Sequence, residues 1–251
     1  NEITGEEPYI RHNINYTQQA YALTPDRVNS EEVPVSGRVT QAAADANRAT
    51  LDNVRLWDPS ALMENLKQQQ EVRLYYQFHD VDVDRYKVDG EYRQMMLSVR
   101  EMEKSELPAE AQTWVSRKLK YTHGYGLTML PVHDFVGGGR PNLYIRNVPP
   151  EVTQGDFQVT RPEIYYGERT EDYVYVRTTE EEFDYPAGDE NVYTTYEGQG
   201  GVNIGNVFRR FMYSWRFDDY RQLLSGYFTD ESRVMFNRDI VQRAKRLAPF
   251  L

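Results

Sequence analysis

Short segments with strong strand propensity dominate the chain from residue 127 to residue 197. There are six of them, and Pro or Gly stands in every interval between them. No interval carries the helical pattern of about 10–15 residues that parallel βαβ units show. The spacing therefore predicts a mostly antiparallel sheet with short loops. The six segments are Leu127–Val132, Leu143–Arg146, Phe157–Thr160, Ile164–Tyr166, Tyr173–Val176 and Val192–Tyr196.

Helical periodicity flanks this region on both sides. Apolar residues recur there at spacings of three and four, next to residues that suit helix starts and ends. A further strand is expected over Val72–Phe78, and Asp89–Gly90 is expected to turn the chain. The expected helices are residues 9–23 with Pro8 in the first turn, Pro59–Gln70, residues 92–102 capped by Asp89 or Gly90, a helix from Pro108 to Gly124 or Gly126, residues 207–215, and a last helix from Thr229 to Leu247.

These elements together predict an α+β fold. A central, mostly antiparallel sheet would occupy the sheet-rich centre at 72–197, with helices from the N- and C-terminal segments packed on it. Residues 24–40 carry Thr24-Pro25-Asp26 and Ser36-Gly37, which are typical of an exposed connector. Residues 207–251 would form the C-terminal helices, and the span 1–251 is expected to be one domain.

Charge and cysteine content exclude several functions. The formal net charge is −10, which opposes broad binding to nucleic acid. The longest stretch without a charged residue is 14 residues, His12–Pro25, whereas a spanning helix needs about 20 apolar residues. The absence of cysteine excludes disulfides and thiol catalysis. The chain starts at Asn1 without a Met or a leader, which suggests a piece of a longer protein.

Charge is also unevenly distributed along the chain. Residues 168–190 hold nine acidic and two basic residues, whereas residues 207–251 hold nine basic and five acidic residues. Two solvated faces would account for this difference. Alternatively, the basic C-terminal helices lie near anionic lipid headgroups, where each basic residue gains about 1 kcal/mol.

The acidic string that begins at Asp80 is the most conspicuous candidate for a metal site. As a calcium loop, it would use Asp80, Asp82 and Asp84 as its first, third and fifth ligands and Glu91 as its twelfth. Arg85 occupies the sixth position, where that loop requires Gly, so a helix–loop–helix calcium site is disfavoured. As a strand, the string places the three Asp residues on one face.

Three alternatives therefore remain open for these aspartates. They could be paired with arginines such as Arg73, Arg85 or Arg93, because like charges in a row need a partner. They could bind a structural calcium ion in a site of another geometry, or they could be catalytic. Calcium is the one cofactor that the sequence suggests.

No spacing of residues identifies a catalytic centre. The four histidines lack a zinc-binding spacing, the glycine-rich segments lack the Lys-Ser/Thr of a phosphate loop, and Gly-x-Ser-x-Gly is absent. We therefore assign no catalytic residue. The 20 tyrosines would suit stacking on sugar rings, and paired carboxylates can hydrolyse glycosides. With 39 acidic residues, the sequence selects no pair.

Several strings distributed over the whole chain resemble the bacterial uncharacterised protein family 0182. Members of that family have N-terminal transmembrane helices and a long domain outside the cytoplasmic membrane, and this chain is similar to part of that domain. The resemblance implies a location in the cell membrane on the extracytoplasmic side, but no activity, cofactor or catalytic residue. The strings are Asn1–Ile3, Pro8–Ile10, Asn53–Asp58, Asp80–Tyr86, Tyr121–Gly126, Pro162–Glu168, Glu182–Pro186, Tyr196–Gly201 and Ala248–Leu251.

Two functional hypotheses follow. The first is a binding, assembly or sensing module of a membrane protein, attached to the membrane through segments outside this chain. Its partners would be cell-envelope proteins or polymers, and not nucleic acid. The alternative is a cell-envelope enzyme or glycan-binding domain that acts on wall polysaccharide through tyrosines and carboxylates.

Overall fold

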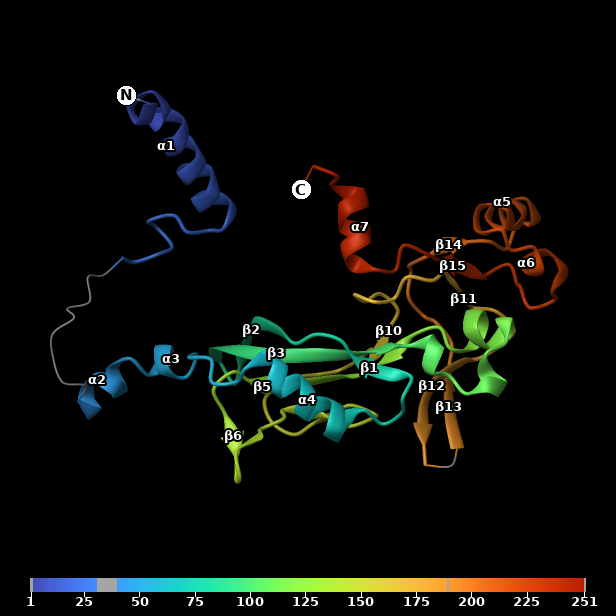
Figure 1. The fold of residues 1–251 in the computed structure, drawn as a ribbon, viewed down its shortest axis with the longest axis horizontal. Coiled ribbons are helices and arrows are strands. Elements are labelled where there is room, and N and C mark those ends of the chain that lie inside the picture. The colour runs from blue at the N-terminus through green and yellow to red at the C-terminus, as the bar shows by residue number, and fades with distance from the viewer. Residues whose placement is uncertain (1, 31–39, 189, 251) are drawn as a thin grey trace. The chain divides into compact units, whose positions relative to one another are not determined.

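The computed structural model describes residues 2–30, 40–188 and 190–250 (Figure 1). Contacts between residues divide the chain into two compact units, residues 1–47 and 48–251. Helices α1 (Glu2–Ala20) and α2 (Gln41–Ala46) belong to the first unit. Helix α1 begins earlier than expected, so Pro8 lies inside it and not in the first turn. Residues 24–30 form the described part of the connector, without helix or strand, and residues 31–39 lie outside the described residues.

The second unit is built on a six-stranded sheet. Its strands are ordered β1-β3-β5-β8-β9, with β2 also paired to β3, and every pair is antiparallel, as predicted. Asp89 and Gly90 form the tight turn between β2 and β3, which confirms the expected turn. The strands are β1 (Tyr76–Phe78), β2 (Asp82–Val88), β3 (Glu91–Met102), β5 (Leu127–Pro131), β8 (Ile145–Arg146) and β9 (Glu151–Val152).

Helix α4 (Pro59–Gln70) covers one face of this sheet (Figure 1). Its observed bounds are those predicted, because Pro59 suits the first turn and the Asp58 carboxylate accepts the amides of Ser60 and Ala61. Leu62 and Leu66, one turn apart, are buried against the core of the sheet. The α+β class is thus confirmed, and an internal helix, α4, packs on the main sheet.

Strand β3 corrects the helix expected over residues 92–102. The strand pairs with β2 and β1 along one edge and with β5 along the other, and its C-terminal half is buried on both faces. Apolar residues therefore occupy both faces and hide the period of two that a half-buried strand shows. Met95 and Met96 are adjacent and both fully buried. Together with Tyr92 and Val99 they have the spacing of three and four residues that is typical of a helix.

The rest of the predicted sheet is divided among smaller sheets. Strands β11 (Val174–Val176), β15 (Arg233–Met235) and β14 (Val202–Asn203) form one sheet, in that order. The run Phe157–Thr160 forms no strand. The two-stranded pairs are β4 (Gly124–Tyr125) with β10 (Glu163–Ile164), β6 (Phe135–Val136) with β7 (Arg140–Pro141), and β12 (Glu182–Ala187) with β13 (Glu190–Thr194).

Short helical turns connect these sheets. The turn η1 (Lys104–Glu106) precedes Pro108, and the helix expected from Pro108 is broken into the turn η2 (Ala109–Ala111) and a π-helical turn η3 (Ser116–Lys120). Thr229 caps no helix, because Arg233–Met235 forms the central strand of the small sheet, and Asp239 caps the last helix instead. The remaining helices are α3 (Arg48–Leu51), α5 (Val207–Phe217), α6 (Arg221–Leu224) and α7 (Ile240–Leu247). Among the described residues, no helix has both the length and the apolar character that crossing a bilayer requires.

Candidate functional sites

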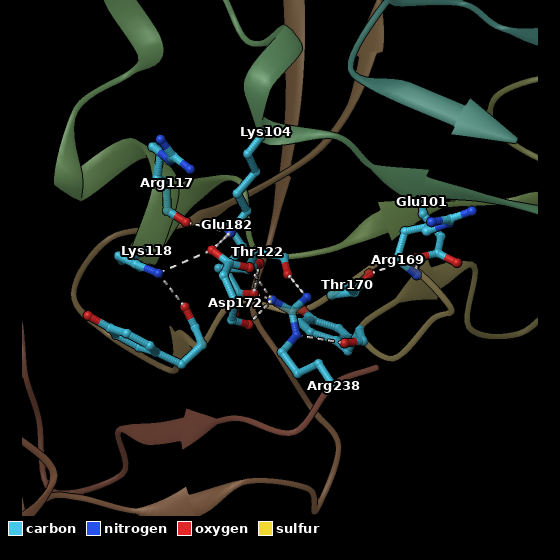
Figure 2. A network of polar contacts seen from close by, with 12 residues as sticks. Glu101, Lys104, Arg117, Lys118, Thr122, Arg169, Thr170, Asp172, Glu182 and Arg238 are labelled. Carbon is cyan, nitrogen blue, oxygen red and sulfur yellow. Dashed lines mark hydrogen bonds and ion pairs between the residues drawn. The ribbon is translucent and has the colours of Figure 1, made fainter. Parts of the chain in front are cut away.

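A buried ionic network centred on Asp172 joins segments from four parts of the second unit (Figure 2). One carboxylate oxygen of Asp172 lies 3.0 Å from Lys104 Nζ and 3.2 Å from Lys118 Nζ. The other lies 3.3 Å from Arg238 Nη1. The side chains of Lys104 and Arg238 are only 8% and 1% exposed. One carboxylate therefore balances three largely buried cations.

The electrostatics of this network follow from burial and charge. Burial opposes ionisation of Asp172, but Lys104, Arg238 and Lys118 outweigh it and lower the pKa of the carboxyl to about 2. Burial also lowers the pKa of Lys104, and Asp172 partly offsets this effect. These ion pairs connect segments that are distant along the chain, which indicates a role in holding the segments together.

Arg238 connects the ionic network to a second buried carboxylate. Its Nε donates to the Tyr165 carbonyl at 2.8 Å, and its Nη2 donates to the Thr122 carbonyl. The hydroxyls of Tyr165 and Thr122 in turn both donate to Glu182. Burial raises the pKa of Glu182, and these hydrogen bonds, which lower it, only partly offset the effect. No sequence spacing indicated this arrangement, because its members are far apart along the chain.

The aspartates of the predicted calcium site are only partly brought together. Carboxylate oxygens of Asp80, Asp82 and Glu168 lie within 4.8 Å of one another. Asp84 and Glu91 are not in this group: Asp84 lies further along β2, and Glu91 follows the turn. The calcium-loop arrangement of these four residues is therefore not formed, because Asp82 and Asp84 lie in one strand of a hairpin. Glu168 was missed by sequence reasoning.

The acidic group lies beside a small cavity of about 200 Å³ that Tyr166 and Glu101 also line. Burial raises the pKa of Asp82 and of Glu168, and neighbouring carboxylates add to both shifts. Among the described residues, no arginine forms an ion pair with Asp80 or Asp82. Binding of a cation there remains a prediction.

Arg73, Arg85 and Arg93 were the arginines expected to balance these aspartates. Arg93 lies 3.9 Å from Asp52 instead. Within residues 40–188 and 190–250, neither Arg73 nor Arg85 forms an ion pair with an acidic side chain. The arginine-paired alternative is therefore not what the described structure contains.

A tyrosine-lined pocket of about 200 Å³ bears on the glycan hypothesis. Tyr165 and Tyr196 line it, with Glu163 and Glu197 as the two carboxylates. Arg161 forms an ion pair with Glu197. The pocket thus combines aromatic side chains with one carboxylate that is already paired.

Asp184, on strand β12, is a buried carboxyl with an unusual environment. Its Oδ1 has no hydrogen-bond partner among the described residues. Burial, followed by the charges of Glu163 and Glu182, raises the pKa of Asp184 to about 7. A perturbed carboxyl of this kind is common at functional sites.

The raised pKa of Asp184 predicts a specific pH dependence. The native state binds the proton more tightly than the unfolded state, so this contribution to stability is present at low pH and is lost as the pH rises from about 4 to about 7. We expect the wild-type chain to lose about 2 kcal/mol more stability between pH 5 and pH 8 than Asp184→Asn does. Urea unfolding at the two pH values measures the difference. Glu190→Gln, at an exposed position of the same hairpin, is the control, and parallel curves for the wild type and Asp184→Asn would contradict the assignment.

Helix α5 presents an apolar face to solvent. We call the exposed side chains Phe208, Phe211, Met212 and Trp215 the α5 stripe; they are 69%, 49%, 48% and 76% exposed. Their spacing places them on one face of the helix. The opposite face contributes Tyr213 and Phe217 to the core that includes Val234, and Asn206 caps the helix.

Comparison with known proteins gives relatives of the same family. A model of the uncharacterised protein family UPF0182 matches residues 1–251. A UPF0182 protein of Pelotomaculum thermopropionicum is 48% identical over 251 residues, and UPF0182 proteins of Trichodesmium erythraeum and of a Sulfurovum species are 46% and 45% identical. No solved structure matches the chain.

The whole of this chain aligns with these three relatives, but it spans only 27% of the length of each. The names of the relatives state no activity. The resemblance found in the sequence motifs is confirmed: the chain belongs to the uncharacterised protein family UPF0182.

Proposed function

We propose that this chain is a binding and assembly module of a larger bacterial membrane protein, on its extracytoplasmic side, and that the α5 stripe lies against an anionic membrane surface. The exposed stripe is the observation that carries the proposal. The extracytoplasmic side comes from the family resemblance. This chain corresponds to only 27% of the length of its relatives, so the membrane segments would lie in the rest of the parent protein.

The composition of the α5 stripe suits the boundary between lipid headgroups and acyl chains. Aromatic and long apolar side chains enter this boundary while the helix lies in its plane. Phe211 and Trp215 contact each other edge to face, with ring centroids 6.5 Å apart, so the exposed surface is continuous there. An exposed apolar patch of this kind marks an interaction site more often than an isolated side chain does.

The charge of helix α5 complements an anionic surface. The helix carries Arg209, Arg210 and Arg216 and no acidic residue. Basic residues near an anionic leaflet gain about 1 kcal/mol each. A stripe that binds a neutral protein surface would not need this excess of positive charge. The charge therefore favours anionic lipid as the binding partner of the stripe.

Vesicle binding tests the proposed surface. We expect the chain to co-sediment with phosphatidylglycerol-containing vesicles at low salt, with a blue shift of Trp215 fluorescence, and to bind phosphatidylcholine vesicles at least tenfold more weakly. Phe208→Ser combined with Phe211→Ser should weaken binding to anionic vesicles at least tenfold, because a buried Phe contributes about 1.5–3 kcal/mol. Phe135→Ser, exposed on strand β6, is the matched control and should bind as the wild type does.

Two outcomes would overturn the assignment of the stripe. Equal vesicle binding by the stripe variant and the control would show that the stripe does not contact lipid. A concentration-dependent dimer that the stripe variant lacks, without vesicle binding, would assign the stripe to a second copy of the chain. The location is tested with Gly137→Cys, at an open position, in the full-length protein: an impermeant maleimide should label it in spheroplasts, and labelling only after lysis would refute the extracytoplasmic side.

The glycan alternative is less well supported by the geometry. The tyrosine-lined pocket of about 200 Å³ is smaller than the roughly 300–1,000 Å³ that is usual for ligand sites. Glu197, one of its two carboxylates, is already paired with Arg161. The exposed stripe therefore supports surface binding better than this pocket supports action on a polysaccharide.

A further inference from the structure

A groove lies between helix α7 and residues 200–202. Its volume is about 320 Å³, and its lining includes two arginines but no acidic residue. The side chains of Tyr166, Val202, Phe236 and Leu247 supply aromatic and aliphatic walls. The groove thus combines positive charge with an apolar interior.

The two arginines of the groove are positioned by neighbours that leave their charge uncompensated. Arg243 and Arg246 lie three residues apart and therefore on one side of α7. The Arg243 guanidinium lies 4.8 Å from the centroid of the Tyr166 ring, and Arg246 donates to the side-chain oxygen of Asn237. Among the described residues, neither arginine forms an ion pair.

Acidic groups near the base of α7 are used elsewhere. Asp239 accepts the backbone amide of Gln242 as the N-cap of the helix. Glu171 accepts a hydrogen bond from the Gln242 side chain. Both carboxylates therefore contact Gln242 and neither lines the groove, so the two guanidinium groups have no counter-ion in its lining.

The opposite wall of the groove is fixed by a third arginine. Arg233 donates to the carbonyls of Gln199, Gly200 and Gly201, at 2.9, 2.7 and 2.9 Å. Gly201 has a φ of +73°, and a Cβ there would lie 2.8 Å from the Val234 carbonyl oxygen. The segment is therefore held close to strand β15, and the groove is formed by a restrained wall.

We propose that this groove binds a small organic anion, with a carboxylate or phosphate group held by Arg243 and Arg246 and an aromatic or aliphatic body against Tyr166, Phe236 and Leu247. A guanidinium group offers paired donors whose geometry matches both kinds of oxyanion. The volume lies at the lower end of the range of ligand sites, which suits a body of about one ring. The proposal is independent of membrane binding, since the α5 stripe does not line this groove.

Ligand-observed NMR titration of the chain tests this site with defined probes. Phenyl phosphate and phenylacetate carry both features, methyl phosphate carries only the oxyanion, and benzyl alcohol carries only the ring. We expect at least one of the first two to bind at least tenfold more tightly than methyl phosphate and benzyl alcohol. Comparing the phosphate with the carboxylate identifies the preferred head group.

Two sets of variants locate the binding. Arg243→Gln with Arg246→Gln should weaken the bound probe at least tenfold, whereas Arg85→Gln with Arg221→Gln removes the same charge at exposed positions outside the groove and should change binding less than twofold. Leu247→Ala, at a position that is 77% exposed, should weaken the ring-bearing probe and leave methyl phosphate unchanged. No binding of either ring-bearing anion at millimolar concentration, or equal losses in the two arginine variants, would overturn the proposal.

Discussion

Replacing Asp172 by Asn is expected to destabilise the second unit by about 3–5 kcal/mol, because Lys104, Lys118 and Arg238 would lose their shared anion in a buried setting. The amide keeps the shape of the side chain, so the loss reports the charge. For a unit of this size, the change corresponds to a fall of about 10 °C in the melting temperature. Calorimetry or thermal unfolding followed by circular dichroism measures it.

A single ion pair with an exposed cation provides the control: Asp172 is itself 31% exposed, but its partners Lys104, Lys118 and Arg238 are only 8%, 16% and 1% exposed. Lys120 Nζ lies 2.9 Å from Glu180, with the two side chains 39% and 26% exposed. Glu180→Gln should therefore cost less than about 1 kcal/mol, although the distance is as short as in the buried network. Similar losses in Asp172→Asn and Glu180→Gln would show that burial does not set the strength of the network.

The lowered pKa of Asp172 gives the same prediction a pH dependence. The pKa is about 2 in the folded chain and about 4 in an unfolded one, so the stabilisation is fully present above pH 4 and is lost as the pH falls towards 2. The wild type should approach the Asn variant in stability over that interval. A constant difference between them from pH 5 to pH 2 would contradict the assigned charge state.

Replacing Gly124 by Ala is expected to cost about 3 kcal/mol, because strand β4 runs against the backbone of β3. A Cβ on Gly124 would lie 2.1 Å from the Arg100 carbonyl oxygen and 2.8 Å from Glu101 Cα. The two strands must separate to admit it. This movement would also disturb Glu101, whose carboxylate accepts the Glu168 amide at 2.6 Å. Chemical denaturation measures the loss.

Gly137→Ala is the matched substitution at an open position. A Cβ on Gly137 would meet no atom within 4 Å, and its backbone does not require glycine. The change should therefore leave stability within about 0.5 kcal/mol of the wild type. If Gly124→Ala were as mild, the close approach of β3 and β4 would not be a constraint on the fold.

Local chemistry made part of the fold predictable from the sequence. The bounds of α4 follow from Asp58 and Pro59, and the β2–β3 turn follows from Asp89 and Gly90. In both cases, the residues that set the structure are adjacent along the chain. The antiparallel pairing of the main sheet, though not its strand order, was predicted from the lack of helices between strands.

Tertiary contacts determined what the sequence did not reveal. Strand β3 is buried on both faces from Met95 onward, so Met95 and Met96 are both apolar and lie at helical spacing to Tyr92 and Val99. Strand β15 replaced the start of an expected helix because two other strands pair with it. These features depend on partners distant in the chain, which periodicity does not detect.

In the candidate sites, too, the sequence revealed some residues, whereas tertiary contacts determined which residues lie together. The sequence identified Asp80 and Asp82 but placed Asp84 and Glu91 with them, while the chain brings in Glu168. The arginines of the proposed groove are local to α7, but their apolar wall comes from Tyr166 and Val202. Side-chain types could be predicted, whereas their grouping required the fold.

The hydrogen bonds of Arg238 carry a consequence for biosynthesis. They reach the Thr122 carbonyl, 116 residues earlier, and the Tyr165 carbonyl, 73 residues earlier. A nascent polypeptide cannot close these contacts until residue 238 has left the ribosome, although the hairpin of β2 and β3 can already pair. Contacts of such long sequence separation form late and leave unpaired strand edges exposed meanwhile. The growing chain therefore exposes the Thr122 and Tyr165 carbonyls until residue 238 is available.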